Sequence, residues 1–356
     1  MRLLIWLHRW LGGALGLVLV ILALSGTALL WEDAWIGVPG AESPPVNEPE
    51  ALARAVEVAR HHGRSLDRIT FAGDTFGLHQ AAYADGSGAY IDGSGQIVDT
   101  WQTMWGRPEL WLFDLHHYLL AGETGKIVAG LAGLAGLFFT LSGAIIWWRT
   151  RRTFALRLWP RRFSRSAIVR QHRDLGILVA PLLVLAFLTG AAMIFEPVKG
   201  ALTAPFGARA PAPHAPAPRI APGDVEQLLA KAQGIYPAAQ PRRLQFTADG
   251  LVLRLRQPFE WTPNGRTYLR ERDGQIATDA PDGSFDKDAM SEKFYPVHAG
   301  KVGGIVWKLA LTLAGLALAM LGLFTTFSFW RDPRARPLRP GYVAPSSPGL
   351  KPAANR

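Results

Sequence analysis

The chain has 356 residues, of which 49% are hydrophobic and 19% are charged, a poorer charge content than the roughly 25% of an ordinary soluble domain. This composition excludes a soluble enzyme, a collagen-like chain and a disordered chain. Cysteine is absent. Disulfides, iron–sulfur clusters, thiolate zinc sites and c-type haem attachment are therefore excluded, and a bound metal has to rely on His, carboxylate or Met ligands.

Four stretches of the chain contain no Asp, Glu, Lys or Arg. They are Trp10–Trp31, Ile127–Trp148, Leu175–Phe195 and Leu309–Trp330. Each is long enough to cross a bilayer as a helix, for which about 20 residues suffice. The predicted segments are transmembrane helices at 1–31, 116–148, 172–195 and 298–330, outer domains at 32–115 and 196–297, an Arg-rich cytoplasmic loop at 149–171 and a disordered cytoplasmic tail at 331–356.

The net charge of +10 is unevenly distributed. Residues 149–173 contain nine arginines and no acid, whereas residues 32–115 contain five basic and thirteen acidic residues. The positive-inside rule therefore places both termini and the Arg-rich loop in the cytoplasm and both polar segments outside. The basic loop is suited to anionic lipid, and no nucleic-acid partner is expected. A cleaved signal peptide is the alternative for the N-terminus, but the apolar run is longer than a signal core of about 7–15 residues, which favours an uncleaved anchor.

Both outer segments combine a helical pattern with short extended runs. The expected helices are 51–61 and 225–232, and the expected strands are 69–71, 90–91, 96–98, 251–255, 268–269 and 275–276. Asp92-Gly93 and Asp273-Gly274 fall between extended runs, which is a hairpin signal. Each segment is thus predicted to be a small α+β domain, and the Pro- and Ala-rich residues 204–222 are predicted to form a stiff linker.

An internal two-fold repeat organises the chain. His8-Arg-Trp-Leu-Gly opens the first span and His172-Arg-Asp-Leu-Gly the third, and a Ser-Gly or Thr-Gly pair follows at the same spacing, with its glycine 18 residues past the histidine. His116 and His298 each precede a later span by the same distance. With both termini inside, these four histidines form one pair at the cytoplasmic face and one at the outer face.

Paired imidazoles between helices are a means of holding a b-type haem with both axial positions filled. The sequence therefore predicts two b haems, with His8 and His172 as ligands of one and His116 and His298 of the other. His117 competes with His116, because neighbours on a helix point about 100° apart and only one can face the partner. Arg9 and Arg173 are the candidates for haem propionate contacts. The remaining histidines (His61, His62, His79 and His214) are expected at solvated surfaces, and Met193 and Met320 in packing.

The chain resembles the PepSY-associated transmembrane proteins in motifs that run through most of its length. The motifs are His8-Arg-Trp-Leu-Gly, Leu115-His116 with Leu119-Leu120 and Gly122-x-x-Gly125, Ser142-Gly143 before Trp147-Trp148, His172-Arg-x-Leu-Gly and His298-Ala-Gly. Thr325-Thr326 departs from the Ser-Gly or Thr-Gly pattern. The resemblance implies a four-helix membrane bundle with two PepSY-like periplasmic domains. It also implies a bacterial inner-membrane ferrisiderophore reductase of the FoxB and PiuB kind, in which two b haems carry electrons to periplasmic iron(III) chelates.

The expected partners are an iron(III)-siderophore or another ferric chelate, membrane lipid, and a quinol or a cytosolic flavoprotein as electron donor. Two alternatives stay open. One is a non-enzymatic membrane sensor or anchor whose outer domains bind a peptide or protease. The other is a cytochrome subunit that supplies electrons to a periplasmic oxidoreductase. The siderophore, the donor and the oligomeric state are not encoded in any motif of the sequence.

Overall fold

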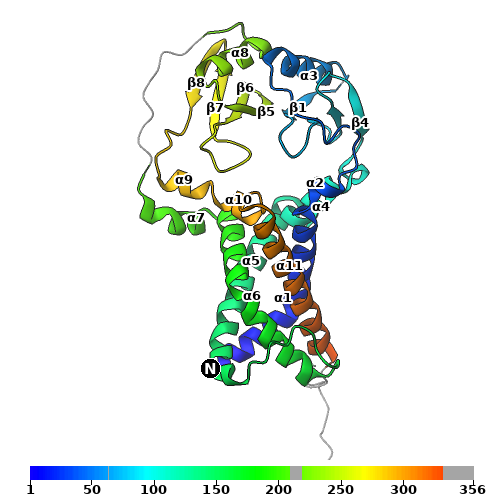
Figure 1. Ribbon diagram of the computed structural model, residues 1–356, viewed down its shortest axis with the longest axis vertical. Helices are drawn as coiled ribbons and strands as arrows, with labels where there is room; N and C mark the ends of the chain where they lie inside the picture. Colours follow the sequence, from blue (N-terminus) through cyan, green and yellow to red (C-terminus); the bar gives the residue numbers. More distant parts are fainter. Residues whose placement is uncertain (63, 209–218, 332–356) are drawn as a thin grey trace, which may run out of the picture.

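The computed structural model describes residues 1–62, 64–208 and 219–331. Within them, four helices are long and apolar enough to cross a membrane. They are α1 (Arg2–Leu29), α5 (Gly122–Thr150), α6 (Arg165–Ile194) and α11 (Gly304–Arg331). Figure 1 shows them as a bundle with a β-rich head at one end and the N-terminus at the other. The prediction of a membrane protein with four spanning helices is thus confirmed. The tail at 332–356 and the middle of the predicted linker, with His214, lie outside the described residues.

Small residues bring the spanning helices close together. Helix α1 packs against α5 and α11, and α6 packs against the same two helices. A Cβ on Gly322 would lie 2.7 Å from Val20, and a Cβ on Gly315 would lie 2.2 Å from Thr27 Oγ1. Helices in a membrane associate through such close contacts, because lipid is as apolar as a leucine side chain. The outward side chains of the bundle, among them Leu17, are exposed apolar residues suited to lipid.

Short connecting helices join the bundle to the head. They are α2 (Glu32–Trp35), η1 (Met104–Gly106), α4 (Pro108–Tyr118), α7 (Glu196–Thr203), η3 (Ala204–Phe206), α9 (Lys287–Ser291) and α10 (Phe294–His298), and η2 (Arg151–Thr153) follows α5 at the other end. From the sequence, two spans were expected to begin at His116 and His298. The structure instead places these residues on α4 and α10. Leu119 and Leu120, with φ of 48° and 57°, turn the chain between α4 and α5.

The head contains one antiparallel sheet to which both outer segments contribute. Its strands are β1 (Leu66–Thr70), β2 (His79–Tyr83), β3 (Gly88–Ile91), β4 (Ile97–Trp101), β5 (Gln240–Thr247), β6 (Gly250–Arg256), β7 (Thr267–Arg272) and β8 (Gln275–Asp279). The strand order is β4-β3-β2-β1-β5-β6-β7-β8. Strands β1 and β5 therefore join the two segments, with Ile69 opposite Leu244. The predicted antiparallel strands are confirmed, and β2 and β5 are additional.

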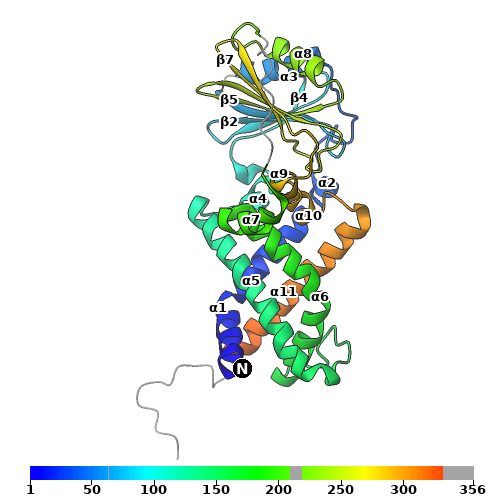
Figure 2. The ribbon, with the colours of Figure 1, turned by 90° about the vertical axis from the view of Figure 1, so that its left-hand side faces the viewer.

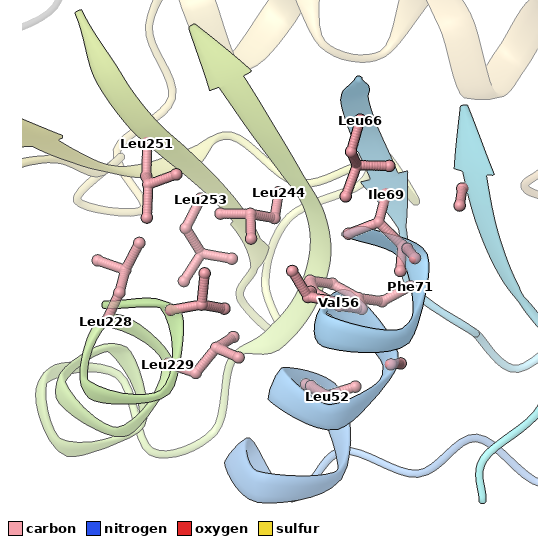
Figure 3. Close-up of a cluster of buried hydrophobic side chains, with 14 of the residues drawn as sticks. Leu52, Val56, Leu66, Ile69, Phe71, Leu228, Leu229, Leu244, Leu251 and Leu253 are labelled. Atoms are coloured by element: carbon pink, nitrogen blue, oxygen red, sulfur yellow. The ribbon is translucent and has the colours of Figure 1, made fainter. Parts of the chain in front are cut away.

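Helices α3 (Pro49–His61) and α8 (Val225–Ile235) cover the face of the sheet that points away from the bundle. Figure 2 shows them above the strands, with α9 and α10 on the opposite side. In Figure 3, Leu52 of α3 and Leu228 of α8 point toward Leu244 and Leu253 at the centre of the sheet. These four side chains are fully buried in one hydrophobic core. The two outer segments thus share their core as well as their sheet.

We expect Leu244→Ala to destabilise the whole head, because Leu244 is completely buried where the two segments meet. Replacing a buried leucine by alanine lowers the free energy of unfolding by about 2–5 kcal/mol. Thermal unfolding in detergent, followed by circular dichroism in the β region, measures the effect. Ile235→Ala is the control, since Ile235 of α8 is 40% exposed. An equal loss in both variants would contradict a shared core.

Candidate haem-binding sites

The first pair of histidines lies inside the bundle, toward its N-terminal end. His8 belongs to α1 and His172 to α6. The centres of their rings are 6.1 Å apart, and the ring planes are inclined by 85°. Phe139 of α5 packs edge-on against the His8 ring at 5.6 Å. Two residues that are far apart in the sequence are thus brought together, with one ring edge-on to the other, and their positions in the repeat predict this proximity.

The second pair lies where the bundle meets the head. His116 on α4 and His298 on α10 have ring centres 6.2 Å apart and planes inclined by 45°. Both histidines are half-buried, and desolvation lowers the pKa of His116 to about 3 and that of His298 to about 4. Both rings are therefore neutral at physiological pH. Neutral imidazole is the form that binds a metal.

Both ring separations match the geometry of two axial ligands on one metal. A metal–nitrogen bond to histidine is about 2 Å long, and a ring nitrogen lies roughly 1.1 Å from the ring centre. Two opposed imidazoles on one metal therefore have ring centres roughly 6 Å apart. Van der Waals packing of two aromatic rings covers a similar range, so the separation alone does not distinguish the two. The orientation of the ring nitrogens does.

A hydroxyl group on a spanning helix lies within hydrogen-bond distance of Nδ1 in all four rings. The pairs are His8 with Ser142 (2.8 Å), His116 with Ser25 (3.1 Å), His172 with Thr325 (2.9 Å) and His298 with Thr189 (3.1 Å). Ser25 and Thr189 donate their own protons to the backbone carbonyls of Ile21 and Leu185. These hydroxyls therefore accept from Nδ1–H.

His298 gives further support, because its Nδ1 also lies 3.1 Å from the carbonyl oxygen of Ala186, which can only accept. An imidazole that donates from Nδ1 presents a lone pair at Nε2. This is the tautomer that metal-ligating histidines adopt, with the second nitrogen fixed by a neighbouring acceptor. The hydroxyls thus orient all four rings for ligation through Nε2.

Three of the four hydroxyl residues are followed by a glycine that leaves room for the imidazole. A Cβ on Gly26 would lie 2.7 Å from His116 Cε1, one on Gly190 would lie 3.1 Å from His298 Cε1, and one on Gly143 would lie 3.5 Å from His8 Cε1. The repeated Ser-Gly or Thr-Gly pair thus has two roles, since the hydroxyl orients the ring and the glycine admits it. The repeat is visible in the sequence, but the role of its hydroxyl becomes apparent only from the contacts with the rings.

The fourth hydroxyl residue departs from this pattern. Thr325 is followed by Thr326, and its hydroxyl still lies on His172 Nδ1. Thr326 occupies the space next to Gly16 of α1, where a Cβ would lie 2.5 Å from Thr326 Oγ1. The close approach of the two helices at this position therefore depends on a glycine of the opposite helix.

An apolar cavity of about 500 Å³ surrounds the first pair. His8 and His172 line it, and along α6 it extends from Arg165 to Phe187. Glycines form much of its wall and are Gly12, Gly16, Gly136, Gly143, Gly176 and Gly322. The volume lies within the range of about 300–1,000 Å³ for cofactor pockets. A flat macrocycle fits such a wall, because the glycines leave the helix surfaces without side chains.

The two candidate propionate contacts differ in their surroundings. Both Arg9 and Arg173 line the cavity. Arg173 binds Asp174 through Nε and Thr153 through Nη1 and Nη2, so its guanidinium already holds the loop that follows α5. Arg9 lies over the Phe329 ring at 5.7 Å. Both arginines therefore stay candidates for a contact with a ligand in the cavity.

His117 does not face the second pair. Its Nδ1 lies 2.9 Å from the carbonyl oxygen of Phe113 on its own helix, and its ring stacks on the Phe113 ring at 3.9 Å. His116 alone of the two neighbours contacts both Ser25 and His298. The geometry therefore favours His116 over His117 as the ligand.

The remaining histidines were expected at solvated surfaces. This prediction is confirmed for His61 and His62, which are exposed. It is wrong for His79, which is 1% exposed in the head. The backbone N–H of Ala72 donates to His79 Nδ1, and burial lowers the pKa of His79 to about 4. The position of His79 on β2, facing inward, explains the burial, and β2 was not foreseen from the sequence.

The family of the chain follows from a comparison with family models. Residues 5–332 match the PepSY-associated TM region, and the chain belongs to this family. No curated protein matches the chain. Within the described residues, no group of three or more His, Cys, Asp and Glu side chains is arranged to hold a metal ion. The two histidine pairs are thus the candidate ligands on which a cofactor site can be based.

We expect Gly26→Ala to displace the His116 ring, because the added methyl group would lie 2.7 Å from His116 Cε1. Overpacking of this kind disfavours the native arrangement by about 1–3 kcal/mol, which corresponds to roughly 5- to 150-fold weaker retention of a ligand held by that ring. The haem content of the purified protein measures the effect. Gly133→Ala on α5 is the matched control, because a Cβ there meets nothing within 4 Å. Equal haem content in both variants would contradict a role for His116.

Proposed function

We propose that this protein is a transmembrane electron carrier that binds two b-type haems and reduces a ferric chelate outside the membrane. The observation that carries the proposal is the hydroxyl contact at Nδ1 of every histidine in two pairs, whose ring centres are 6.1 and 6.2 Å apart. In each pair, a hydroxyl group contacts Nδ1 of both rings, so that Nε2 is the nitrogen available to bind iron. Two imidazoles would hold each haem iron from both sides, an arrangement that favours electron transfer over oxygen chemistry.

Bound haem would supply one-electron redox chemistry at each pair. His8 and His172 would hold one haem, and His116 and His298 the other. The hydroxyls of Ser142, Thr325, Ser25 and Thr189 would fix ring orientation and raise ligand basicity. Around the first pair, the wall of the cavity is mostly apolar, which would limit the reorganisation that accompanies a change of charge. No acid, base or nucleophile is required for outer-sphere transfer.

The distance between the pairs is compatible with transfer along the bundle. His8 and Gly26, next to the His116 ring, are separated by 18 residues of α1, which is roughly 27 Å of helix at about 1.5 Å per residue. The distance from a ligand in the cavity to the second pair is shorter than this. The cavity extends past the first pair as far as Phe187 of α6, whose ring lies against Gly136. A macrocycle in the cavity would thus reach toward the second pair.

Charge distribution supports an orientation in the bacterial inner membrane. The Arg-rich loop 149–171 and the N-terminus lie at the end of the bundle remote from the head. By the positive-inside rule this end faces the cytoplasm, so the head is periplasmic and the tail is cytoplasmic. Electrons from a quinol or a cytosolic flavoprotein would enter near His8 and His172 and leave near His116 and His298.

The architecture also supports the proposed internal duplication. The strand order proceeds outward from the central pair, with β1 to β4 on one side and β5 to β8 on the other. Each half supplies one helix to the same face of the sheet, namely α3 or α8. Each half also supplies one histidine to each pair. Duplication of a unit with two spanning helices and one PepSY-like domain accounts for all three observations.

The proposed acceptor is iron(III) in a siderophore or another chelate. One electron leaves the protein and converts iron(III) to iron(II), with no bond broken in the chelator. Hard oxygen ligands hold iron(II) more weakly than iron(III), so the metal is released. A protein with soluble domains on the acceptor side and no nucleotide motif in its sequence suits this role, because its electrons come from another carrier.

We expect His298→Ala to remove one of two haems, because His116 would lose its partner at 6.2 Å. Haem content should fall by about half, and the visible spectrum should lose one of two low-spin α bands. His8→Ala should remove the other band. His117→Ala is the control and should leave both bands in place, since His117 contacts Phe113. A colourless, fully helical wild-type protein would support the sensor alternative instead.

The acceptor is tested with the reduced protein. We expect the purified holoprotein, reduced with dithionite and freed from excess reductant without oxygen, to be reoxidised on addition of a ferric chelate. The α bands should decay, and one iron(II) should appear per electron lost, measured with a chromogenic iron(II) chelator. His298→Ala should slow this reaction by at least about tenfold, because it removes a ligand of the outer haem. Stable α bands with every chelate would favour a cytochrome that supplies electrons to a protein partner.

A further inference from the structure

The face of the sheet that points toward the bundle carries an arginine cluster, defined here as Arg242, Arg243, Arg254 and Arg256. On β5 and β6, Leu244 and the alternate residues of β6 point into the core beneath α3 and α8. Because side chains alternate along a strand, Arg243, Arg254 and Arg256 lie on the opposite face. The register of β5 is irregular between Pro241 and Arg243, and Arg242 interacts with Arg256 and with Tyr295 of α10, so Arg242 belongs to the same side. Figure 2 shows α9 and α10 on that side of the sheet.

The register of the strands places like charges side by side. Arg243 of β5 is directly opposite Arg254 of β6. Thr70 of β1 is opposite Arg243 on the other side, and Arg68 lies two residues before Thr70 on the same face. Like charges in directly opposed positions destabilise a sheet. Asp74 and Asp67 oppose this repulsion at Arg242 and Arg243 less strongly than the neighbouring arginines produce it, so the cluster favours the binding of a further anion.

Two members of the cluster have buried donors without a partner. The Nε atoms of Arg242 and Arg256 are inaccessible and make no hydrogen bond to any described residue. The Arg242 guanidinium lies over Gly73, where a Cβ would be 2.3 Å from Nη1. A buried donor normally has a partner. The absence of one within the described residues thus indicates a missing acceptor.

Electrostatics link the cluster to the helix that carries His298. Burial, followed by the charge of Arg256, lowers the pKa of Arg242, and Tyr295 of α10 is among the groups that oppose this shift. Burial, followed by the charges of Arg68 and Arg254, lowers the pKa of Arg243. The charge of Arg243 in turn acts to lower the pKa of Tyr295. The cluster therefore generates a positive potential next to α10.

We propose that the arginine cluster binds the carboxylate groups of a negatively charged ferric chelate and holds it beside α10, near the outer histidine pair. The proposal rests on the proposed function and specifies its substrate class. Guanidinium groups bind carboxylates through paired, charge-assisted hydrogen bonds, and a group of them favours a chelate with several carboxylates and a net negative charge. The propionates of an outer haem carry the same chemistry, and the experiment separates the two sources.

The test compares two probes in the reoxidation assay of the holoprotein. Fe(III)–EDTA carries a net negative charge and carboxylates, whereas Fe(III) tris(acetohydroxamate) is neutral. Each chelate is compared only with itself across variants, because their potentials differ. The variant is the double substitution Arg242→Gln and Arg243→Gln. The matched control is Arg54→Gln, which removes one exposed positive charge from α3 on the other face of the sheet.

We expect the double variant to lower the second-order rate constant for Fe(III)–EDTA about tenfold, as loss of electrostatic attraction predicts, and to leave the rate for the neutral chelate within about twofold of wild type. Added salt should slow the Fe(III)–EDTA reaction of the wild type more than that of the variant, because salt screens the attraction. Arg54→Gln should match the wild type with both probes. The head of the double variant should unfold at a temperature no lower than that of the wild type, because the substitutions remove charges that repel one another.

Three outcomes would overturn the proposal while leaving electron transfer intact. An unchanged Fe(III)–EDTA rate would show that the cluster does not bind the chelate. An equal fall with both chelates would indicate damage to the electron path. Loss of the outer α band in the double variant would assign the arginines to haem propionates. Failure of the wild type to reduce any chelate would instead refute the proposed function itself.

Discussion

A hydrogen bond between an imidazole Nδ1 and a hydroxyl on a spanning helix orients each of the four central histidines. This contact ties the register of one helix to that of another, because the hydroxyl and the ring have to lie at the same depth. The residue after Ser25 or Thr189 has to be a glycine, because a side chain there would collide with the imidazole ring. Both the close packing of the bundle and the direction of Nε2 depend on this arrangement.

The shared sheet adds a second constraint. Strand β1 pairs with β5, so the two halves of the chain are joined above the membrane as well as within it. His116 and His298 belong to different halves, and their separation depends on how these halves are held together. A head with two independent domains would leave the outer pair free to separate. The continuous core beneath α3 and α8 resists such movement, because its side chains are fully buried.

The sequence predicts the spans and the histidine pairs because both leave strong local signals. Uninterrupted apolar runs define the helices, and the repeated spacing identifies His8, His172, His116 and His298. Other features depend on distant contacts. The pairing of Ile69 with Leu244 joins residues far apart in the chain and has no local signature.

Irregular backbone is equally hard to foresee. Strand β5 begins Gln-Pro-Arg-Arg, without the alternation that marks a strand, and the left-handed conformation of Leu119 and Leu120 is rare for leucine. His79 was misjudged because its inward position depends on the unrecognised β2. In each case tertiary structure overrides a weak local preference.

The central position of β1 has a consequence for biosynthesis. Arg68 of β1 pairs with Gln245 of β5, which the ribosome adds roughly 10–35 s later at about 5–20 residues per second. During that interval β1 presents an unpaired edge, and such edges recruit strands from other chains. Nascent chains of this protein therefore pass through an aggregation-prone stage that ends only when the second half emerges.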